Sequence, residues 1–314
     1  MLSRCPSSAE SLSDAFWIDL FEPTDAERSS VELATGLRVP TRAQIDEIEW
    51  SSRVFIEGGA SYLSTPVLDG IEISHAVRTT IGFVLDTRRL VTVRFAPVAA
   101  FDRLVSGYSS ASLPHAGDVF LKILETFVDH AADAFERASA ELEQISCAGF
   151  RREPRRRTRF TDASDALHGA LRQLGRMEEG ISHVRDMLLG IDRIIAFVLD
   201  NDANPGLTGH ASRLHAIRAD VVSLTDYQVH LSGKVQFLLD ATLGFISIQQ
   251  NDIFKALTIA SVVGVPPVLI AGIYGMNFRV MPELGWAFGY PVALLSMGVS
   301  ALIPLCWFRW RGWL

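Results

Sequence analysis

Two uncharged apolar stretches near the C-terminal end constrain this chain more than any other feature of its sequence. The first, ALTIASVVGVPPVLIAGIY, covers residues 256–274, and the second, WAFGYPVALLSMGVSALIPLCWF, covers residues 286–308. A helix of about 20 such residues crosses the roughly 30 Å hydrocarbon layer of a bilayer. Aromatic residues flank the second stretch at both ends, as is common at membrane interfaces. The sequence therefore predicts two transmembrane helices and a lipid bilayer as a partner.

The distribution of basic residues predicts the orientation of these helices. Lys255 precedes the first stretch and Arg309 and Arg311 follow the second, whereas the connecting loop holds only Arg279 and Glu283. Basic residues concentrate on the cytoplasmic side of a membrane. We therefore expect an inner (cell) membrane protein with both termini in the cytoplasm. The alternative, a buried helical hairpin of a soluble protein, has to accommodate two long uncharged stretches side by side.

The N-terminal part of the chain has the pattern of an α/β domain. AFWIDLFEPT, residues 15–24, alternates apolar and polar residues and breaks at Pro23, which predicts a strand followed by a helix that begins at Thr24. Two β-rich runs surround the turn signal DTRR within IGFVLDTRRLVTVRF, residues 81–95, and predict a hairpin. The MLSRCPSSAESLSDAF terminus has no apolar core, so a secretory signal is not expected.

Helical periodicity dominates from about residue 116 onwards. The apolar residues that first show it are Val119, Ile123, Phe127 and Phe135. The pattern continues over 161–199, and DNDANPGLTG, residues 200–209, predicts a break.

Residues 210–274 contain only isolated glycines and one Pro-Pro pair, so a single helix can run through them. At 1.5 Å per residue that helix would be roughly 95 Å long, which favours a bundle formed with other copies of the chain. The apolar positions expected to form the packed seam of this bundle are Leu214, Ile217, Val221, Leu224 and Leu231.

These patterns divide the chain into four predicted parts. Residues 1–115 form a cytoplasmic α/β domain, and 116–209 form a cytoplasmic helical hairpin region. Residues 210–254 form a stalk helix, and 255–314 form a transmembrane domain of two helices.

Composition and motif content argue against several classes of function. A net charge of -7 disfavours a general affinity for nucleic acid. The three cysteines are few and far apart, which predicts neither a disulfide framework nor a zinc site. We find no glycine-rich phosphate loop and no nucleophile elbow, so neither an enzyme nor a cofactor is expected. The arginine-rich segment 151–160 is interpreted as a solvated corner between helices, with a subunit or lipid headgroup contact as the alternative.

The C-terminal motifs resemble those of the CorA family of divalent-cation (magnesium/cobalt) channels, within the GMN-motif superfamily. The resemblance rests on AGIYGMNF at 271–278, MPELGW at 281–286, the second apolar stretch and the basic end RWRGWL at 309–314. Weaker matches are WIDLFEPT at 17–24, LVTVRF at 90–95 and the whole stretch 238–278. The family implies a homopentamer in which each subunit has an α/β cytoplasmic domain, a long stalk helix that lines the pore and a second, outer membrane helix.

The resemblance assigns the GMN motif, Gly275, Met276 and Asn277, to an outer selectivity ring. Five copies of Asn277 would present neutral amide oxygens, which can hydrogen-bond the water held on a cation. Mg²⁺ loses water reluctantly, so a ring that reads the hydrated ion suits it. We therefore expect passive, potential-driven transport of hydrated divalent cations, above all Mg²⁺ and also Co²⁺ or Ni²⁺. A polar cap that ends the helix is the structural alternative for Asn277.

Steps of three and four residues back from the motif define a predicted pore stripe on the stalk and first membrane helix. Its members are Asn251, Phe254, Leu257 or Thr258, Ser261, Val265, Val268 and Gly272. The family has a narrow apolar pore on the cytoplasmic side, so Phe254, Leu257 and Val265 would form a hydrophobic gate. The alternative is that these residues pack against neighbouring helices.

Two features depart from the family pattern. Family members often have an acidic residue directly after GMNF, whereas this chain has Arg279, which leaves Glu283 as the carboxylate of the loop. A weaker field for cations at the pore mouth follows. The regulatory carboxylates of the family have no unambiguous counterparts, and the candidates on the stalk are Asp220, Asp226, Asp240 and Asp252.

Two other functions remain open on the sequence. One is a zinc transporter of the same superfamily, with Zn²⁺ as the transported ion. The other is a membrane-anchored scaffold or sensor that has the fold and does not conduct.

Overall fold

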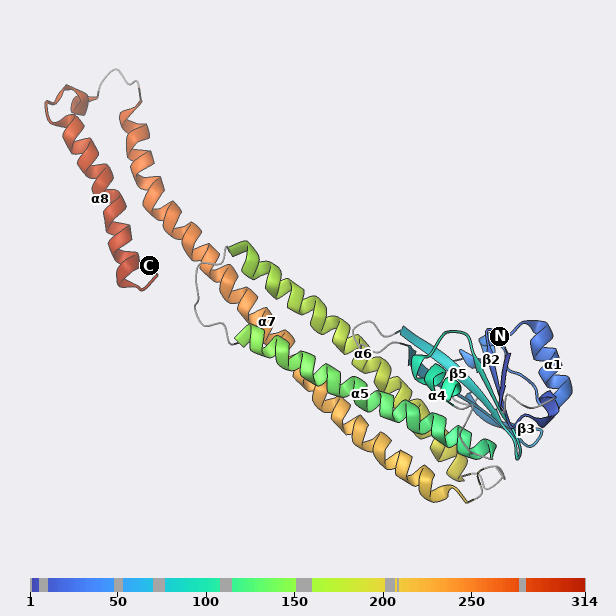
Figure 1. Cartoon of the computed structure of the whole chain (residues 1–314). Helices are drawn as coiled ribbons and strands as arrows, with labels where there is room; N and C mark the ends of the chain where they lie inside the picture. Colours follow the sequence, from blue (N-terminus) through green and yellow to red (C-terminus); the bar gives the residue numbers. More distant parts are fainter. Residues whose placement is uncertain are drawn as a thin grey trace. The chain divides into compact units, whose positions relative to one another are not determined.

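The chain forms two compact units, Met1–Asp240 and Ala241–Leu314. The structure is a computed structural model that describes residues 2–5, 11–47, 53–69, 77–107, 115–150, 160–200, 207, 209–276 and 281–313. Figure 1 shows a sheet with short helices followed by long helices in the first unit, and a helical pair in the second. Residues 151–159 of the arginine-rich segment 151–160 lie outside the described residues.

A six-stranded sheet organises the N-terminal part of the first unit. The strand order is β1-β2-β6-β5-β4-β3. The strands are β1 (Leu2–Cys5), β2 (Trp17–Phe21), β3 (Val54–Glu57), β4 (Ala60–Asp69), β5 (Val77–Leu85) and β6 (Leu90–Arg94). Strands β2 and β6 pair in parallel, and the other neighbours pair antiparallel. The predicted strand within 15–24 and the hairpin within 81–95 are confirmed as β2 and as β5–β6.

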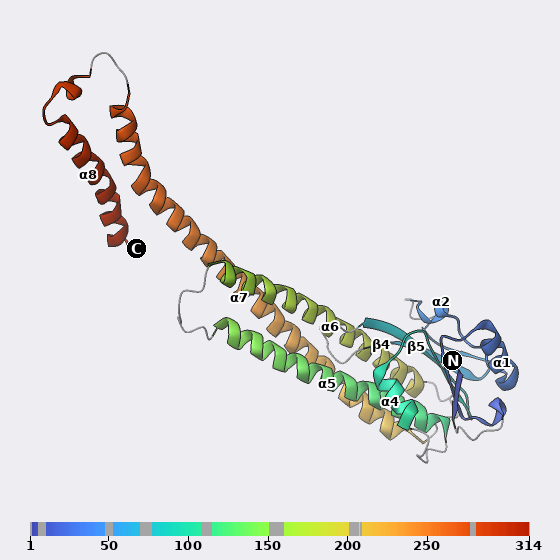
Figure 2. The same ribbon diagram turned by 45° about the horizontal axis from the view of Figure 1, so that its top comes forward.

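Helices cover both faces of the sheet. The short helices are η1 (Leu12–Asp14), α1 (Asp25–Thr35), α2 (Arg42–Ile45) and α4 (Ala99–Gly107). Residues of α1 and α2 join one apolar core on one face, and α4 joins the long helices in a second core on the other face. Figure 2 shows α1 and α2 on the far side of the sheet from α4 and α5.

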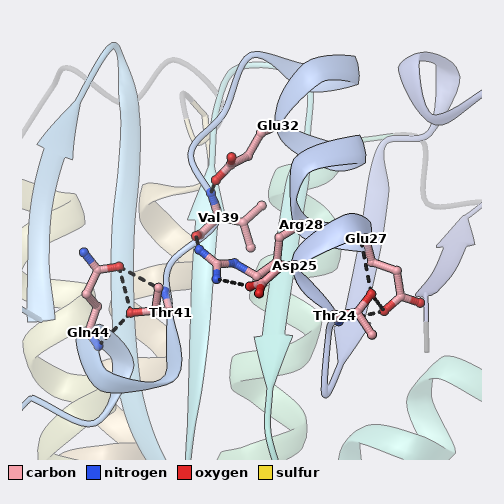
Figure 3. Close-up of polar contacts among 8 residues, drawn as sticks. All are labelled: Thr24, Asp25, Glu27, Arg28, Glu32, Val39, Thr41 and Gln44. Carbon is pink, nitrogen blue, oxygen red and sulfur yellow. Dashed lines mark hydrogen bonds and ion pairs between the residues drawn. The ribbon is translucent and has the colours of Figure 1, made fainter.

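Capping explains where α1 and α2 begin. The Thr24 hydroxyl accepts a hydrogen bond from the Glu27 backbone N–H at 3.2 Å, and the Glu27 carboxylate accepts one from the Thr24 N–H at 2.9 Å (Figure 3). This capping box satisfies two N–H groups that lack partners within the helix. The predicted helix start at Thr24 is therefore confirmed. Thr41 and Gln44 form the same arrangement at α2.

The long helices of the chain are α5 (Ala116–Phe150), α6 (Phe160–Asp200) and α7 (Ala211–Tyr274). The predicted periodic residues Val119, Ile123, Phe127 and Phe135 are buried on α5. Helix α6 crosses the sheet at Gly190, where an added Cβ would lie 3.0 Å from Pro66 Cδ and even closer to Thr65. Only glycine therefore allows α6 to approach β4 this closely.

The N-terminal part of α7 packs within its own chain. The Arg213 guanidinium contacts the Glu125 carboxylate of α5 at 2.6 Å, and Arg218 contacts Asp192 of α6 at 2.9 Å. The residues predicted as a seam between copies belong instead to the core shared with α5 and α6: Leu214, Ile217, Val221 and Leu231 are buried there, and Leu224 packs against them. That prediction was wrong because α5 and α6 supply the apolar surface that the seam needs.

A buried ion pair joins two strands of the sheet. Arg94 Nη2 of β6 lies 3.0 Å from Asp19 Oδ2 of β2, and the Thr92 hydroxyl donates to Asp19 Oδ1 at 2.8 Å. The Asp19 and Arg94 side chains are only 4% and 8% exposed. Burial raises the pKa of the Asp19 carboxyl, while the Arg94 guanidinium and the Thr92 hydroxyl oppose that shift. The Arg94 guanidinium also lies over the rings of Phe21 and Phe101, 4.9 and 4.8 Å from their centres.

The second unit contains the rest of α7, the short helix η5 (Pro282–Gly285) and α8 (Gly289–Trp310). The first predicted membrane stretch, 256–274, is helical to its end at Tyr274, and Pro266 and Pro267 lie inside the helix. The second predicted stretch begins at Trp286, three residues before α8 starts at Gly289. The proposed four-part division of the chain remains a prediction.

Removal of the buried Arg94 guanidinium should destabilise the protein far more than removal of an exposed guanidinium. Arg94→Gln leaves the Asp19 carboxylate buried without its cation, which costs about 3–5 kcal/mol of unfolding free energy. Arg78→Gln is the matched control, because Arg78 and its partner Asp186 are 45% and 40% exposed, and it should cost at most about 1 kcal/mol. Denaturant titration of the purified protein measures both. Equal losses in the two variants would contradict this role of Arg94.

Candidate functional site

Helices α7 and α8 of the second unit have apolar surfaces that the chain itself does not cover. They are the two described helices that are long and apolar enough to cross a membrane, and of their most apolar stretches 0% and 11% are buried. The core helix of a soluble protein would be mostly buried. The alternative of a buried hairpin therefore does not fit, and these surfaces require lipid or another chain.

The predicted pore stripe lies on the exposed side of α7. All of its positions are exposed: Asn251, Phe254, Leu257, Thr258, Ser261, Val265, Val268 and Gly272. The partly covered positions of the same segment are Lys255, Ile259, Val263, Pro266, Pro267 and Ile270. Since each residue turns an α-helix by about 100°, these two sets lie on roughly opposite sides of α7. Figures 1 and 2 both show α8 running beside this part of α7.

The stripe carries apolar and neutral polar groups. Phe254, Leu257 and Val268 are 65%, 62% and 70% exposed, which is unusual for such large apolar side chains in a single chain. The Thr258 hydroxyl donates to the Phe254 carbonyl at 2.8 Å, so its oxygen retains lone pairs that can accept. The side chains of this stripe therefore offer apolar surface and neutral hydrogen-bonding groups, with no carboxylate, imidazole or thiolate among them.

The GMN motif begins where α7 ends. The Gly275 N–H donates to the Ala271 carbonyl at 3.0 Å, and the Met276 N–H donates to the Ile273 carbonyl at 3.2 Å. An added Cβ at Gly275 would lie 3.1 Å from the Ala271 oxygen, so glycine suits this tight end. Asn277 and Arg279 lie outside the described residues, and Glu283 belongs to η5. The selectivity ring therefore stays a prediction.

The four candidate regulatory carboxylates are exposed on α7 and do not gather in one place. Asp240 accepts a hydrogen bond from Gln236 Nε2 at 3.1 Å, and Asp252 pairs with Lys255 Nζ at 3.0 Å. Asp220 and Asp226 are exposed on the N-terminal half of α7. Within the part of the chain that the structure describes, no group of three or more His, Cys, Asp or Glu side chains could hold a metal ion. The assignment of a regulatory role to these four residues stays a prediction.

Sequence reasoning missed two polar arrangements. The Asp252–Lys255 pair could have been found from its i, i+3 spacing on a helix. A second arrangement, a cavity on the α1–α2 face of the sheet, draws on residues between 38 and 83 and has no motif to signal it.

The chain matches one family model and is similar to proteins of known function. The family model described as "CorA-like Mg2+ transporter protein" matches residues 13–310. The "Magnesium transport protein CorA" of Salmonella typhimurium (strain LT2) is 33% identical over 308 residues, which cover 98% of this chain and 94% of that protein. The protein of the same name from Escherichia coli (strain K12) matches with the same identity and coverage.

A solved structure has the same fold. The CorA magnesium transporter from Methanocaldococcus jannaschii superposes with a TM-score of 0.74 at 20% identity, over 96% of this chain and 92% of that one. At this identity the likeness concerns the fold alone.

Proposed function

Because the chain belongs to the CorA-like family of Mg²⁺ transporters, we propose that it is a membrane channel that conducts hydrated divalent cations passively. Mg²⁺ is the principal ion, and Co²⁺ and Ni²⁺ pass as surrogates. The observation that carries the proposal is a 33% identity that extends over 98% of the chain. The membrane helices and the GMN motif thus lie within the matched region.

The membrane potential is sufficient to drive this transport. A doubly charged ion gains about 4.6 kcal/mol for each 100 mV, a factor of about two thousand in concentration at equilibrium. ATP hydrolysis is not required. The positive-inside rule supports an orientation with both termini in the cytoplasm and the GMN motif on the outside.

The pore is proposed to form between copies of the chain. The exposed stripe of α7 supports this arrangement, because Phe254, Val265 and Val268 would be covered when several copies meet around an axis. Five copies would bring Gly275, Met276 and Asn277 together as the outer ring, with Glu283 and Arg279 at its rim. The carboxylates at Asp220, Asp226, Asp240 and Asp252 are candidates for a regulatory ion site on the stalk.

The chemistry of the stripe favours Mg²⁺ over Zn²⁺. Its positions offer amide, hydroxyl and apolar groups, and neither histidine nor cysteine is among them. Imidazole and thiolate are the softer ligands that hold Zn²⁺ by direct bonds. Cys306 lies on α8, which we place outside the pore.

Loss of the proposed ring of Asn277 side-chain amides should stop transport. Asn277→Ala is expected to reduce Mg²⁺ uptake into proteoliposomes to background, because the waters of the ion lose their acceptors at the filter. Size-exclusion chromatography checks that assembly is intact. Ser296→Ala on α8, whose hydroxyl donates within its own helix at 2.8 Å, is the control that should retain full uptake. Normal flux through an assembled Asn277→Ala protein rejects the filter assignment.

Loss of the apolar ring should open the gate. Phe254→Gly is expected to conduct Mg²⁺ even when Mg²⁺ on the cytoplasmic side is high, because a narrow apolar ring that sheds water is the proposed barrier. Ile253→Gly is the matched control, since it imposes the same glycine penalty on the helix from a position outside the stripe. Stopped-flow measurements with a fluorescent Mg²⁺ indicator compare them. If Phe254→Gly leaks no more than Ile253→Gly, then Phe254 is a packing residue.

A substitution-inert cation distinguishes the hydrated ion from the directly bound ion. Hexammine cobalt imitates hydrated Mg²⁺ in size and cannot exchange its ligands, so it should block Mg²⁺ uptake from the outside. Arg279 weakens that block, because it adds positive charge at the pore mouth. Zinc uptake that is faster than Mg²⁺ uptake and insensitive to hexammine cobalt would support the zinc transporter instead.

A further inference from the structure

A cavity of about 230 Å³ lies on the sheet face that carries α1 and α2. Phe55 of β3 and Tyr62 and Ser64 of β4 line it from the sheet, and Gln44 lines it from α2. Alternate residues of a strand point to the same face, so Tyr62 and Ser64 lie side by side there. Arg53, which precedes β3, completes this group. The ion pathway proposed above uses none of these residues.

Ser64 lines the cavity and carries a buried hydroxyl without a hydrogen-bond partner among the described residues. The residue is 7% exposed, and its Oγ has no hydrogen-bond partner among the described residues. Its cross-strand neighbour in β5 is Gly82, which has no side chain to contact the hydroxyl. Buried polar atoms in native proteins are almost always hydrogen-bonded. The Ser64 oxygen has almost no accessible surface, so a rotation of the side chain about its Cα–Cβ bond is needed to bring the hydroxyl to a bound molecule.

Gln44 adds a second donor of fixed orientation. Its Oε1 accepts hydrogen bonds from the Thr41 N–H at 3.0 Å and from the Thr41 hydroxyl at 3.2 Å. A backbone N–H can only donate, so the oxygen must face Thr41 and the Nε2 group must face away. Figure 3 shows the Gln44 nitrogen on the far side of the amide from Thr41. The capping box thus holds an N–H₂ donor at the edge of the cavity.

The loop before α2 is held in place from α1. The Glu32 carboxylate accepts a hydrogen bond from the Val39 N–H at 2.8 Å, and Arg28 Nη2 donates to the Val39 carbonyl at 3.4 Å (Figure 3). Arg28 also pairs with Asp25 at 3.3 Å. These contacts hold the cavity wall in the absence of a ligand, so binding requires little ordering of this loop.

Arg53 supplies positive charge. Its Nε donates to the Glu47 carbonyl at 2.6 Å, and within the described ranges no carboxylate forms an ion pair with its guanidinium. Burial lowers the pKa of Arg53, and the nearby positive charges of Arg78 and Arg193 lower it further, while the Asp186 and Asp46 carboxylates oppose that shift. Arg38, in contrast, pairs with Glu57 at 3.2 Å. An anion beside Arg53 would give its guanidinium a direct ion-pair partner.

An aromatic pair lines the same cavity, and Phe55 is the more exposed of its two residues. The rings of Phe55 and Tyr62 are stacked, with centres 4.9 Å apart and an interplanar angle of 2°. The Arg38 guanidinium lies 5.6 Å from the centre of the Tyr62 ring. Glu47 also lines the cavity and can accept a hydrogen bond from a ligand. A planar ring that carries a donor group matches these surfaces.

We propose that this cavity binds a small organic anion in which a phosphate or carboxylate group is joined to a planar ring. Arg53, Ser64 and Gln44 bind the anionic group, and Phe55 contacts the ring. Small-molecule sites combine an apolar lining with a few convergent polar groups, as this cavity does. Its volume of about 230 Å³ limits the ligand to a small metabolite.

Calorimetry on the full-length protein in detergent tests the proposal. The probes are adenosine monophosphate and benzoate, and adenosine and benzamide are their neutral counterparts. At least one anion should bind, at least about tenfold more tightly than its neutral counterpart, because hydrogen bonds to charged groups are the stronger ones. Binding of neither anion at about 5 mM, or equal binding of the neutral compounds, overturns the proposal.

Two variants and one control locate the site. Arg53→Gln should weaken binding of the anionic probe by about 10- to 100-fold. Arg42→Gln, on α2 in an exposed pair with Asp46 at 3.6 Å, should leave it unchanged. Ser64→Ala should weaken binding while the melting temperature without ligand stays the same or rises, since it removes an unpaired buried hydroxyl. Unchanged affinity in both Arg53→Gln and Ser64→Ala places the probe elsewhere and overturns the proposal.

Discussion

The structure depends on one helix, α7, whose first part packs against other helices of the chain and whose last part has an uncovered apolar surface. Helix α7 runs from Ala211 to Tyr274. A helix satisfies most of its backbone hydrogen bonds internally, so it can pass from water into lipid; the exceptions within α7 are the carbonyls four residues before Pro266 and Pro267, which lack an N–H donor. Its first part buries Leu214, Ile217 and Val221 in the core of its own chain. Its last part leaves the most apolar stretch uncovered. The same backbone geometry therefore serves two environments, and only the side chains differ.

In the proposed pore, the exposed stripe and the GMN motif would determine which groups an ion meets. Amide, hydroxyl and apolar groups bind the water around an ion better than the ion itself, which suits a cation that dehydrates slowly. Passage then depends on pore width and on the field at the mouth. In the proposed channel, Arg279 in place of the acidic residue that is common in the family would lower that field for cations and would slow ion entry.

Sequence patterns predicted those parts of the fold where local signals agree. The break at Pro23, the cap at Thr24 and the DTRR turn fixed β2, α1 and the β5–β6 hairpin, because turn and cap chemistry act over a few residues. The parallel pairing of β2 with β6 joins segments far apart in the chain and has no local signal. The seam from Leu214 to Leu231 was assigned to the wrong partner for a related reason. Periodicity identifies an apolar face and not what covers it.

The residues of the candidate sites could likewise be predicted only where a local sequence pattern marks them. The pore stripe could be proposed from helical spacing and a short motif, and it remains a prediction. Arg53, Gln44 and Ser64, in contrast, come together only because β3 pairs with β4 and α2 packs nearby. Their side chains belong to a cavity that the fold creates, and no spacing in the sequence connects them. The Asp19–Arg94 pair lies between these cases, since both residues sit in recognisable segments and only the sheet brings them to 3.0 Å.

The central claim is passive conduction of Mg²⁺, and flux through the purified protein in proteoliposomes tests it most directly. With a potential that is negative inside and without ATP, Mg²⁺ influx should rise steeply with the size of the potential and should disappear when the potential is collapsed. Empty liposomes provide the background. Assembled protein that gives no flux above this background at any potential would contradict the account and leave a membrane-anchored scaffold as the function.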